Sequence, residues 1–350
     1  MKSPVNIAKE SYSKILKIDE LTHQLEKIHA EELNIKETQN QTTEKLLTLE
    51  KTLQTIQQTI QQNLDLQNKN ISYATSLLKY THDITKIPKA QGFEKVLQEG
   101  NFILYKEITK ILDSKKIKFF LDFGILIGIA RHNNFIPWDD DIDISVPRQY
   151  YELLPSIFDN VFKNTGLFYK QSEIIRIYYQ NTPLQLDIFP IDFYDKNLNK
   201  EGKQILKQKV INYNSIIKFN WEKLFLQESV IVSPTLKEIR KHYYHEVCDK
   251  DITAEQANKI KSTIIHSPES PRYERTYILD YNDIFPLRKI KFLDIQVPIP
   301  NNIHTLLEKY YGDYFAFPSD IDQKHKDIES RINTFTIMKI EEIIQNNKII

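Results

Sequence analysis

The chain has 350 residues, of which 41% are hydrophobic and 27% charged, ordinary values for a globular protein. Its 47 basic and 47 acidic residues balance, so composition gives no argument for a nucleic-acid partner. The only cysteine, Cys248, excludes an internal disulfide and a cysteine zinc site. Because signal-peptide and membrane-span patterns are absent, we expect a cytoplasmic protein, with association at the inner face of the membrane left open.

Residues 9–80 contain neither Gly nor Pro and carry apolar residues at alternating steps of three and four. These are Leu21, Leu25, Ile28, Ile35, Leu46, Leu49, Leu53, Ile56 and Ile60. The pattern predicts a helical coiled coil within residues 1–88, which would form homo-oligomers or dock a partner. Polar residues at Glu32, Gln39 and Thr42 either fix its register or mark a break between two helices. The alternative is a pair of helices packed on the chain's own globular domain.

A second region, residues 93–350, mixes strand and helix patterns and is predicted to be an α+β or α/β domain. Its predicted strands are 117–124, 141–146, 173–181 and 184–194. Its predicted helices are 93–113, 125–134, 149–161, 201–228 and 331–347, with helix and Pro-punctuated loops between 229 and 319.

The segment "FIPWDDDIDISVP" (135–147) places four aspartates within five positions. Successive side chains of a strand alternate between faces, so Asp141 and Asp143 are predicted to share a face. Two neighbouring carboxylates suit Mg²⁺, which leaves its other positions to water and phosphates. Asp139 and Asp140 are either turn residues or members of the same site.

Asp187 lies within the apolar run "LQLDIFPID", where an ionised side chain needs a partner. A metal shared with Asp141 and Asp143 would supply that partner, and so would a nearby Lys or Arg.

A glycine turn precedes the acidic segment. Gly124 follows a predicted strand, and Gly128 comes four residues later. Such a turn lets backbone N–H groups approach a phosphate, although helix packing alone also explains the spacing. Arg131 and His132 add hydrogen-bond donors at its far end.

The segment "FLDFGILIGIARHNNFIPWDDDIDISVPRQYYELL" (120–154) closely resembles the signature region of the LicD family. These are phosphocholine and related phosphodiester-forming transferases, and the fukutin-related proteins belong with them. Further segments match in order: "LDIFPID" (186–192), "DIFPL" (283–287), "VPIPNN" (297–302) and "LLEKYYGDYFAFP" (306–318).

The resemblance implies an α+β, nucleotidyltransferase-like mixed sheet flanked by helices. It implies Gly124 as the phosphate-turn glycine, Asp141 and Asp143 as the metal pair, and Asp187 as the third carboxylate. It also implies Mg²⁺ (or Mn²⁺), a CDP-activated alcohol donor, a glycan acceptor and release of CMP.

Further roles follow as hypotheses. Asp187, Asp143 or His132 would act as the general base, and Arg131 would contact donor phosphate. Trp138 would stack on a base or sugar, or brace the loop as a core aromatic. Gly128 and Asp140 complete the predicted substrate-binding set.

The chain departs from the family pattern at three places. Phe123-Gly124-Ile125 stands where the family often has Gly-Gly-Thr, and "HNNF" (132–135) lacks a usual glycine. The segment 320–327 keeps His325 without the expected preceding arginine. Two other functions remain open: a nucleotidyltransferase that moves NMP from an NTP to a small acceptor, and a non-catalytic coiled-coil scaffold.

Overall fold

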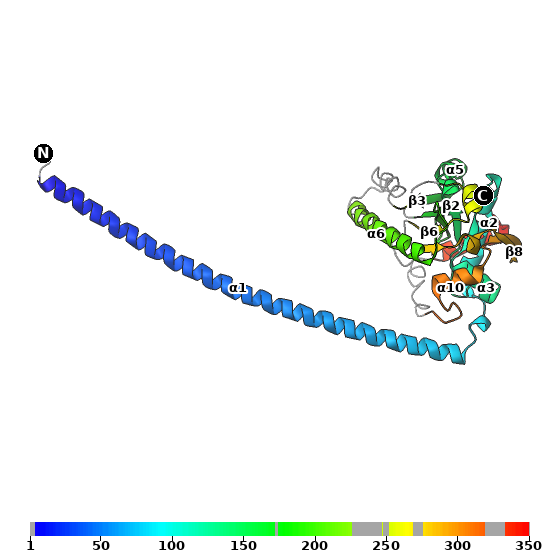
Figure 1. Cartoon of the computed structure of the whole chain (residues 1–350), viewed down its shortest axis with the longest axis horizontal. Coiled ribbons are helices and arrows are strands. Elements are labelled where there is room, and N and C mark those ends of the chain that lie inside the picture. The colour runs from blue at the N-terminus through cyan, green and yellow to red at the C-terminus, as the bar shows by residue number, and fades with distance from the viewer. Residues whose placement is uncertain are drawn as a thin grey trace. The chain divides into compact units, whose positions relative to one another are not determined.

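The computed structural model of the chain describes residues 4–171, 174–225, 247, 252–268, 276–318 and 333–349. The chain divides into two compact units, Met1–Ala74 and Thr75–Ile350 (Figure 1). The division therefore falls before the end of the long N-terminal helix, whereas the sequence placed it between residues 88 and 93.

The N-terminal helix α1 (Pro4–Thr81) is one continuous α-helix of 78 residues. The lack of Gly and of internal Pro explains its continuity, because those residues are the strongest helix breakers. Its polar seam positions, Glu32 to Thr42, lie inside the helix, so they do not mark a break between two helices. The seam is exposed, with Leu25 at 67% and Leu49 at 65%. The helix is confirmed, and its association into a coiled coil stays a prediction.

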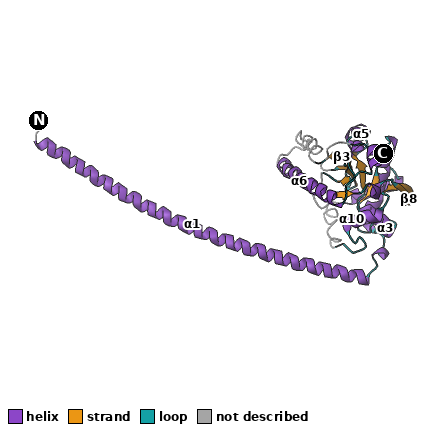
Figure 2. Cartoon of the chain, in the orientation of Figure 1, coloured by secondary structure: helices purple, strands orange, loops and turns teal. Residues whose placement is uncertain are grey.

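The second unit contains a seven-stranded mixed sheet (Figure 2), as predicted. Five strands follow the order β1-β2-β5-β4-β3, while β6 pairs with β5 and β7 with β6. The bounds are β1 Phe120–Asp122, β2 Asp143–Pro147, β3 Leu167–Gln171, β4 Ile175–Tyr179, β5 Gln185–Phe193, β6 Ile264–His266 and β7 Tyr277–Leu279. The pair β2–β5 is parallel, and the other described pairs of this sheet are antiparallel.

Helix α2 (Gly92–Ser114) anchors the core of this unit. Its fully buried Leu104, Ile108 and Leu112 follow helical spacing, so one face packs inward against β5 and α12 (Thr334–Asn346). The other described elements are η1 Ile84–Lys86, α3 Gly124–His132, α4 Arg148–Tyr151, α5 Leu154–Val161, α6 Lys200–Phe225, α8 Ala254–Ile260, α9 Tyr281–Ile284, α10 Ile303–Tyr311 and the hairpin β8 Arg288–Phe292 with β9 Ile295–Ile299.

Several element boundaries differ from prediction. The strand expected at 141–146 begins at Asp143, so Asp141 precedes it. The helix expected at 149–161 is divided into α4 and α5, with Pro155 in the first turn of α5, where proline is favoured. Strand β3 was not predicted, because its half-exposed "LFYKQ" is too short and polar to stand out. The segment 320–327 lies outside the described residues.

Among the described helices, none is both long and apolar enough to cross a lipid bilayer.

Candidate active site

Four charged residues form a row across neighbouring strands. In strand register, Asp122 of β1 lies opposite Asp143 of β2, and Asp143 lies opposite Asp187 of β5. Asp187 in turn lies opposite Arg176 of β4. Residues opposite one another in paired strands project to the same face of a sheet. The row therefore gathers three carboxylates and one guanidinium on one face.

Arg176 is the cationic end of this row. Its Nε donates to Asp187 Oδ2 at 3.1 Å, and Asp187 is only 7% exposed. The sequence predicted either a shared metal or a nearby Lys or Arg as the partner of this carboxylate, and Arg176 is such a basic partner. An ion pair of this kind stabilises the charged forms of both partners.

The loop before β2 adds three more carboxylates. One oxygen each from Asp139, Asp140 and Asp141 lies within 4.8 Å of the others, a spacing compatible with a shared metal ion. The structure therefore brings Asp141 together with Asp139 and Asp140 in the loop. Asp143 is instead aligned with Asp187 in the sheet.

Asp143 interacts electrostatically with carboxylates of both the acidic loop and the strand row. Burial is the largest cause that raises the pKa of Asp143 well above its usual range, followed by the charges of Asp141, Asp187, Asp139 and Asp122. Crowded carboxylates disfavour one another's ionisation, and a divalent cation among them would remove that penalty. The donor set is all oxygen, which matches Mg²⁺ or Mn²⁺ rather than a thiolate-binding metal.

Helix α2 fixes the backbone of the acidic loop. Gln98 Nε2 donates to the carbonyl oxygens of Ile136 and Asp139, at 2.9 and 2.6 Å. Asn101 Nδ2 donates to the Asp140 carbonyl at 2.5 Å, and its Oδ1 accepts from the Gln185 amide at 2.9 Å. Asn101 therefore ties the loop to the start of β5, the strand that carries Asp187.

A buried polar network surrounds Asp122, which sequence reasoning missed. Asp122 Oδ2 accepts from Ser145 Oγ at 2.6 Å and lies 2.7 Å from His266 Nε2. The other ring nitrogen, His266 Nδ1, lies 2.9 Å from Ser267 Oγ. Asp122, Ser145 and His266 are all fully buried. The one sequence signal was an aspartate in the apolar strand "FFLDF", and nothing in the sequence marked His266 as its partner.

The predicted glycine turn joins β1 to α3, and both glycines are in tight contact with the acidic loop. A Cβ on Gly124 would meet an Asp139 carboxylate oxygen at 2.3 Å. A Cβ on Gly128 would meet the Asn134 carbonyl oxygen at 2.4 Å. Both glycines are therefore required for close packing of the loop on α3. This contact places the Asp139 carboxylate against the first residue of that helix, where negative charge is favoured.

Phe123 occupies the turn position that departs from the family pattern. Its φ of 51° and ψ of −127° lie in a region that glycine adopts readily and other residues rarely do. Its ring packs against Phe189, His266 and Tyr310, with centroid separations of 4.7, 5.0 and 5.2 Å. Aromatic packing thus holds a backbone conformation that the residue would otherwise avoid.

Arg131 and His132 make contacts within the fold. Arg131 Nε donates to His132 Nε2 at 2.9 Å, and its Nη1 donates to the Tyr314 carbonyl at 2.7 Å. Its guanidinium lies 5.4 Å from the centre of the Trp138 ring, which also meets His132 edge-on. These three predicted substrate-binding residues therefore form one cluster at the end of α3, and Arg131 is 8% exposed.

Burial and the adjacent Arg131 lower the pKa of His132 to about 4, although a hydrogen bond with the Thr85 backbone opposes this shift. Burial likewise lowers the pKa of Arg131 to about 10, opposed by the charge of Asp139. At neutral pH, His132 is therefore uncharged and Arg131 remains a cation.

The end of α10, which packs on α3, brings two tyrosines near the carboxylates. Burial and then the charge of Asp122 raise the pKa of Tyr310 well above its usual range. Tyr311 is 43% exposed as a whole residue, but burial of its phenol group, followed by the charges of Asp143 and Asp139, also raises its pKa. Both phenols therefore stay protonated at neutral pH and are potential hydrogen-bond donors. Both tyrosines lie in the segment "LLEKYYGDYFAFP" (306–318), and no sequence pattern marked them as site residues.

Comparisons with known proteins point in one direction. The family model described as LicD/FKTN/FKRP, nucleotidyltransferase domain, matches residues 116–230. Lipopolysaccharide cholinephosphotransferase LicD of Haemophilus influenzae is 23% identical over 247 residues, which cover 61% of this chain and 88% of that protein. Ribitol 5-phosphate transferase FKRP of Mus musculus is 26% identical over 98 residues, covering 26% of this chain and 19% of that protein.

The matched residues contain the complete charged row, from Asp122 through Asp143 and Arg176 to Asp187, together with the acidic loop. The comparisons therefore support a LicD family assignment, carried by the match to the nucleotidyltransferase domain at residues 116–230.

Proposed function

We propose that this protein is a metal-dependent transferase. It would move a phospho-alcohol group, phosphocholine-like in kind, from a CDP-activated donor to a hydroxyl of a cell-surface glycan, releasing CMP. The glycan would be lipopolysaccharide, capsule or teichoic acid, and the reaction would occur in the cytoplasm at the inner face of the membrane. The observation that carries the proposal is the alignment of Asp122, Asp143 and Asp187 beside the acidic loop. The named activities of LicD and FKRP support a phospho-group transferred to a glycan.

Asp141, Asp143 and Asp187 are the proposed metal ligands, with Asp139 and Asp140 beside them. When bound, Mg²⁺ (or Mn²⁺) would neutralise charge on the donor diphosphate and on the departing CMP. Gly124, at the start of α3, is proposed to let the donor phosphate approach backbone N–H groups. The protonated phenol of Tyr311 would donate a hydrogen bond to a phosphate oxygen.

Three residues were candidates for the general base, and their surroundings separate them. His132 is the weakest candidate, because its pKa is about 4 and its Nε2 already accepts a hydrogen bond from Arg131. Asp187 already accepts a hydrogen bond from Arg176 and is also a proposed metal ligand, which makes it a weaker candidate. Asp143 is also a proposed metal ligand, and a bound cation would cancel the carboxylate crowding that raises its pKa, so it would serve as the base only through an oxygen that the metal does not hold.

A donor screen tests the proposal. The protein would be incubated with Mg²⁺, an acceptor glycan and either CTP, CDP-choline, CDP-ethanolamine, CDP-glycerol or CDP-ribitol, and products would be identified by mass spectrometry. We expect CMP from one CDP-alcohol, and loss of at least about 100-fold in rate for Asp143→Asn. Lys118→Gln, an exposed substitution two residues before β1, is the control.

Two outcomes would replace the proposal. Pyrophosphate released from CTP, with no CMP from any CDP-alcohol, would indicate a nucleotidyltransferase that uses an NTP. Full biological activity in an Asp143→Asn variant that binds no metal would instead indicate a non-catalytic scaffold.

A further inference from the structure

Helix α1 carries a long exposed apolar seam. Beyond Ile60 the seam continues through Leu64, Ile71 and Leu78, which are 46%, 43% and 39% exposed. The neighbouring Tyr73, outside the seam, is 72% exposed. A helix of 78 residues with an apolar stripe open to water requires a partner for that stripe, because helices in water derive most of their stability from packing.

One irregular step connects the two halves of the seam. The steps from Ile56 to Ile60 and from Ile60 to Leu64 are both four residues, whereas three and four alternate on either side. Such a four-residue insertion locally unwinds a coiled coil without ending it. The spacing of the seam is therefore continuous from Leu21 to Leu78, with polar residues at Glu32, Gln39, Thr42 and Gln67, and it suits another helix of similar length.

The residues beside the seam indicate which helix that is. In a parallel, in-register coiled coil, the residue directly before the first core position of each heptad faces the residue five places later in the neighbouring chain. Here those first core positions are 25, 32, 39, 46 and 53. Lys45 would face Glu50 of the other copy, and Glu31 would face Lys36. Both pairs have opposite charges. The remaining pairs of this kind between residues 24 and 57 lack like charges: Gln24 with His29, Thr38 with Thr43, and Thr52 with Gln57.

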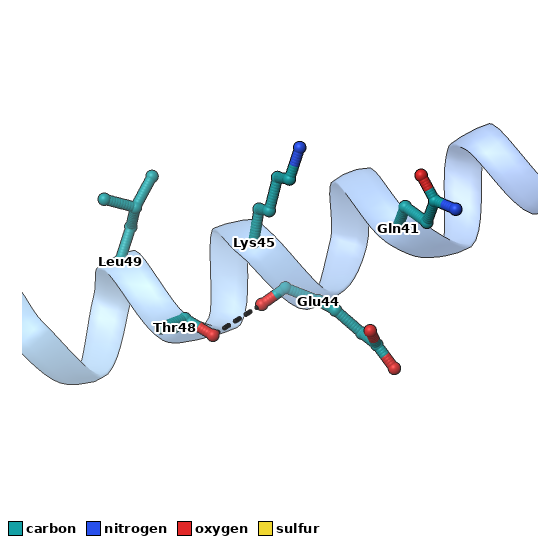
Figure 3. A pocket seen from close by; sticks show the side chains of 5 residues that line it. All are labelled: Gln41, Glu44, Lys45, Thr48 and Leu49. Carbon is teal, nitrogen blue, oxygen red and sulfur yellow. Dashed lines mark hydrogen bonds between the residues drawn. The ribbon is translucent and has the colours of Figure 1, made fainter.

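Figure 3 shows this part of the helix. Lys45 and Leu49 project to the same side of α1, and Glu44 projects to a different side. The shallow hollow drawn there is lined by residues of α1 alone: Gln41, Glu44, Lys45, Thr48 and Leu49. Lys45 thus flanks the apolar stripe, while Glu44 lies away from it.

We propose that the partner of this surface is a second copy of the chain, bound as a parallel, in-register coiled coil from Leu21 to Leu78. The charge pattern is self-complementary, because each helix supplies both members of the pairs Lys45–Glu50 and Glu31–Lys36. Binding to an unrelated helix would not explain why the charges of this helix match its own copy. Glu32 is then a core residue facing its own copy, which weakens the coil locally but penalises other registers. This proposal is independent of the transferase reaction.

A charge-swap experiment tests the register in the full-length chain. Neither Lys45 nor Glu50 has an oppositely charged residue three or four positions away in its own helix, so their coupling reports on contacts between chains. We expect a mass by light scattering of twice the 41.5 kDa of one chain. Lys45→Glu and Glu50→Lys should each raise the dissociation constant roughly fivefold, and the double variant should restore it.

Glu44→Lys, on a different side of the helix, is the matched control and should leave the dissociation constant unchanged. Two results would overturn the proposal. One is a light-scattering mass equal to that of a single chain. The other is a double variant whose dissociation constant is as high as the two single-variant effects multiplied together.

A cysteine experiment tests the orientation independently. In a Cys248→Ser background, Thr42→Cys and Gln67→Cys place single thiols at two separated seam positions. Thr48→Cys is the control, because Thr42 and Thr48 donate the same hydrogen bond to a carbonyl four residues earlier, at 2.8 and 2.9 Å. We expect both seam variants to form covalent dimers on mild oxidation and the control not to do so.

An antiparallel pair brings at most one of these two seam positions to its own copy. Cross-linking at only one seam position, or at neither, would therefore contradict the parallel arrangement.

Discussion

At the scale of single residues, Phe123 shows aromatic packing that offsets the free-energy cost of an unfavourable backbone conformation. Its positive φ costs about 1–3 kcal/mol, which the contacts with Phe189, His266 and Tyr310 offset. Phe123→Ala and Phe123→Gly both remove the ring, but only glycine relieves the backbone strain. We therefore expect the glycine variant to be more stable than the alanine variant by about 1 kcal/mol or more, measured by urea unfolding. Equal stabilities would show that the turn is unstrained.

His132 should make stability depend on pH. Its pKa falls from 6.5 to about 4 on folding, so between these values the unfolded chain binds more protons than the folded chain. Its contribution is therefore fully present above about pH 6.5 and is lost as the pH falls toward 4. Urea unfolding at pH 5 and pH 7 should show a smaller difference for His132→Gln than for the unmodified protein. The exposed His82→Gln is the control, and an equal reduction there would contradict the assignment.

At the scale of elements, Asn101 links three of them: α2, the acidic loop and β5. Asn101→Ala removes both the bond to the Asp140 carbonyl and the bond to the Gln185 amide. We expect a loss of about 1–3 kcal/mol in unfolding free energy and a lower rate of CMP release. Asn101→Asp keeps the acceptor for Gln185 but buries a carboxylate against the Asp140 carbonyl oxygen, so it should be at least as destabilising as Asn101→Ala. A smaller loss in Asn101→Asp than in Asn101→Ala would show that the bond to Gln185 outweighs the bond to the loop.

The same elements show what could be predicted from the sequence. Alternation and apolar flanks were sufficient to select Asp143 and Asp187, because those signals are local. The exact start of β2 was not predictable, so Asp141 was assigned to a strand face when it lies in the preceding loop. Asp122 and His266 could not be paired in advance, because strand neighbours far apart in the chain depend on how the whole sheet assembles.

At the scale of the whole molecule, the division at Ala74–Thr75 predicts where the chain can be cut. Lys79 forms an ion pair with Asp313, so the last helical turns belong with the second unit. Deleting residues 1–74 should leave that unit folded, with an unchanged thermal midpoint and a single-chain mass by light scattering. Deleting residues 1–85 also removes the Lys79 ion pair and the buried Ile84, and should lower the midpoint. An oligomeric mass after the shorter deletion would locate self-association outside α1.

The contact between Asp122 and His266 joins residues 144 positions apart, and the parallel pair β2–β5 aligns Asp143 with Asp187. Contacts so distant in sequence form slowly, because a long loop must close before any of them is gained. The three carboxylates of the row are therefore aligned only when β1, β2 and β5 have paired, and the contact between Asp122 and His266 requires β6 as well. During refolding, binding of the proposed metal ion should therefore appear only with the phase in which β2 and β5 pair.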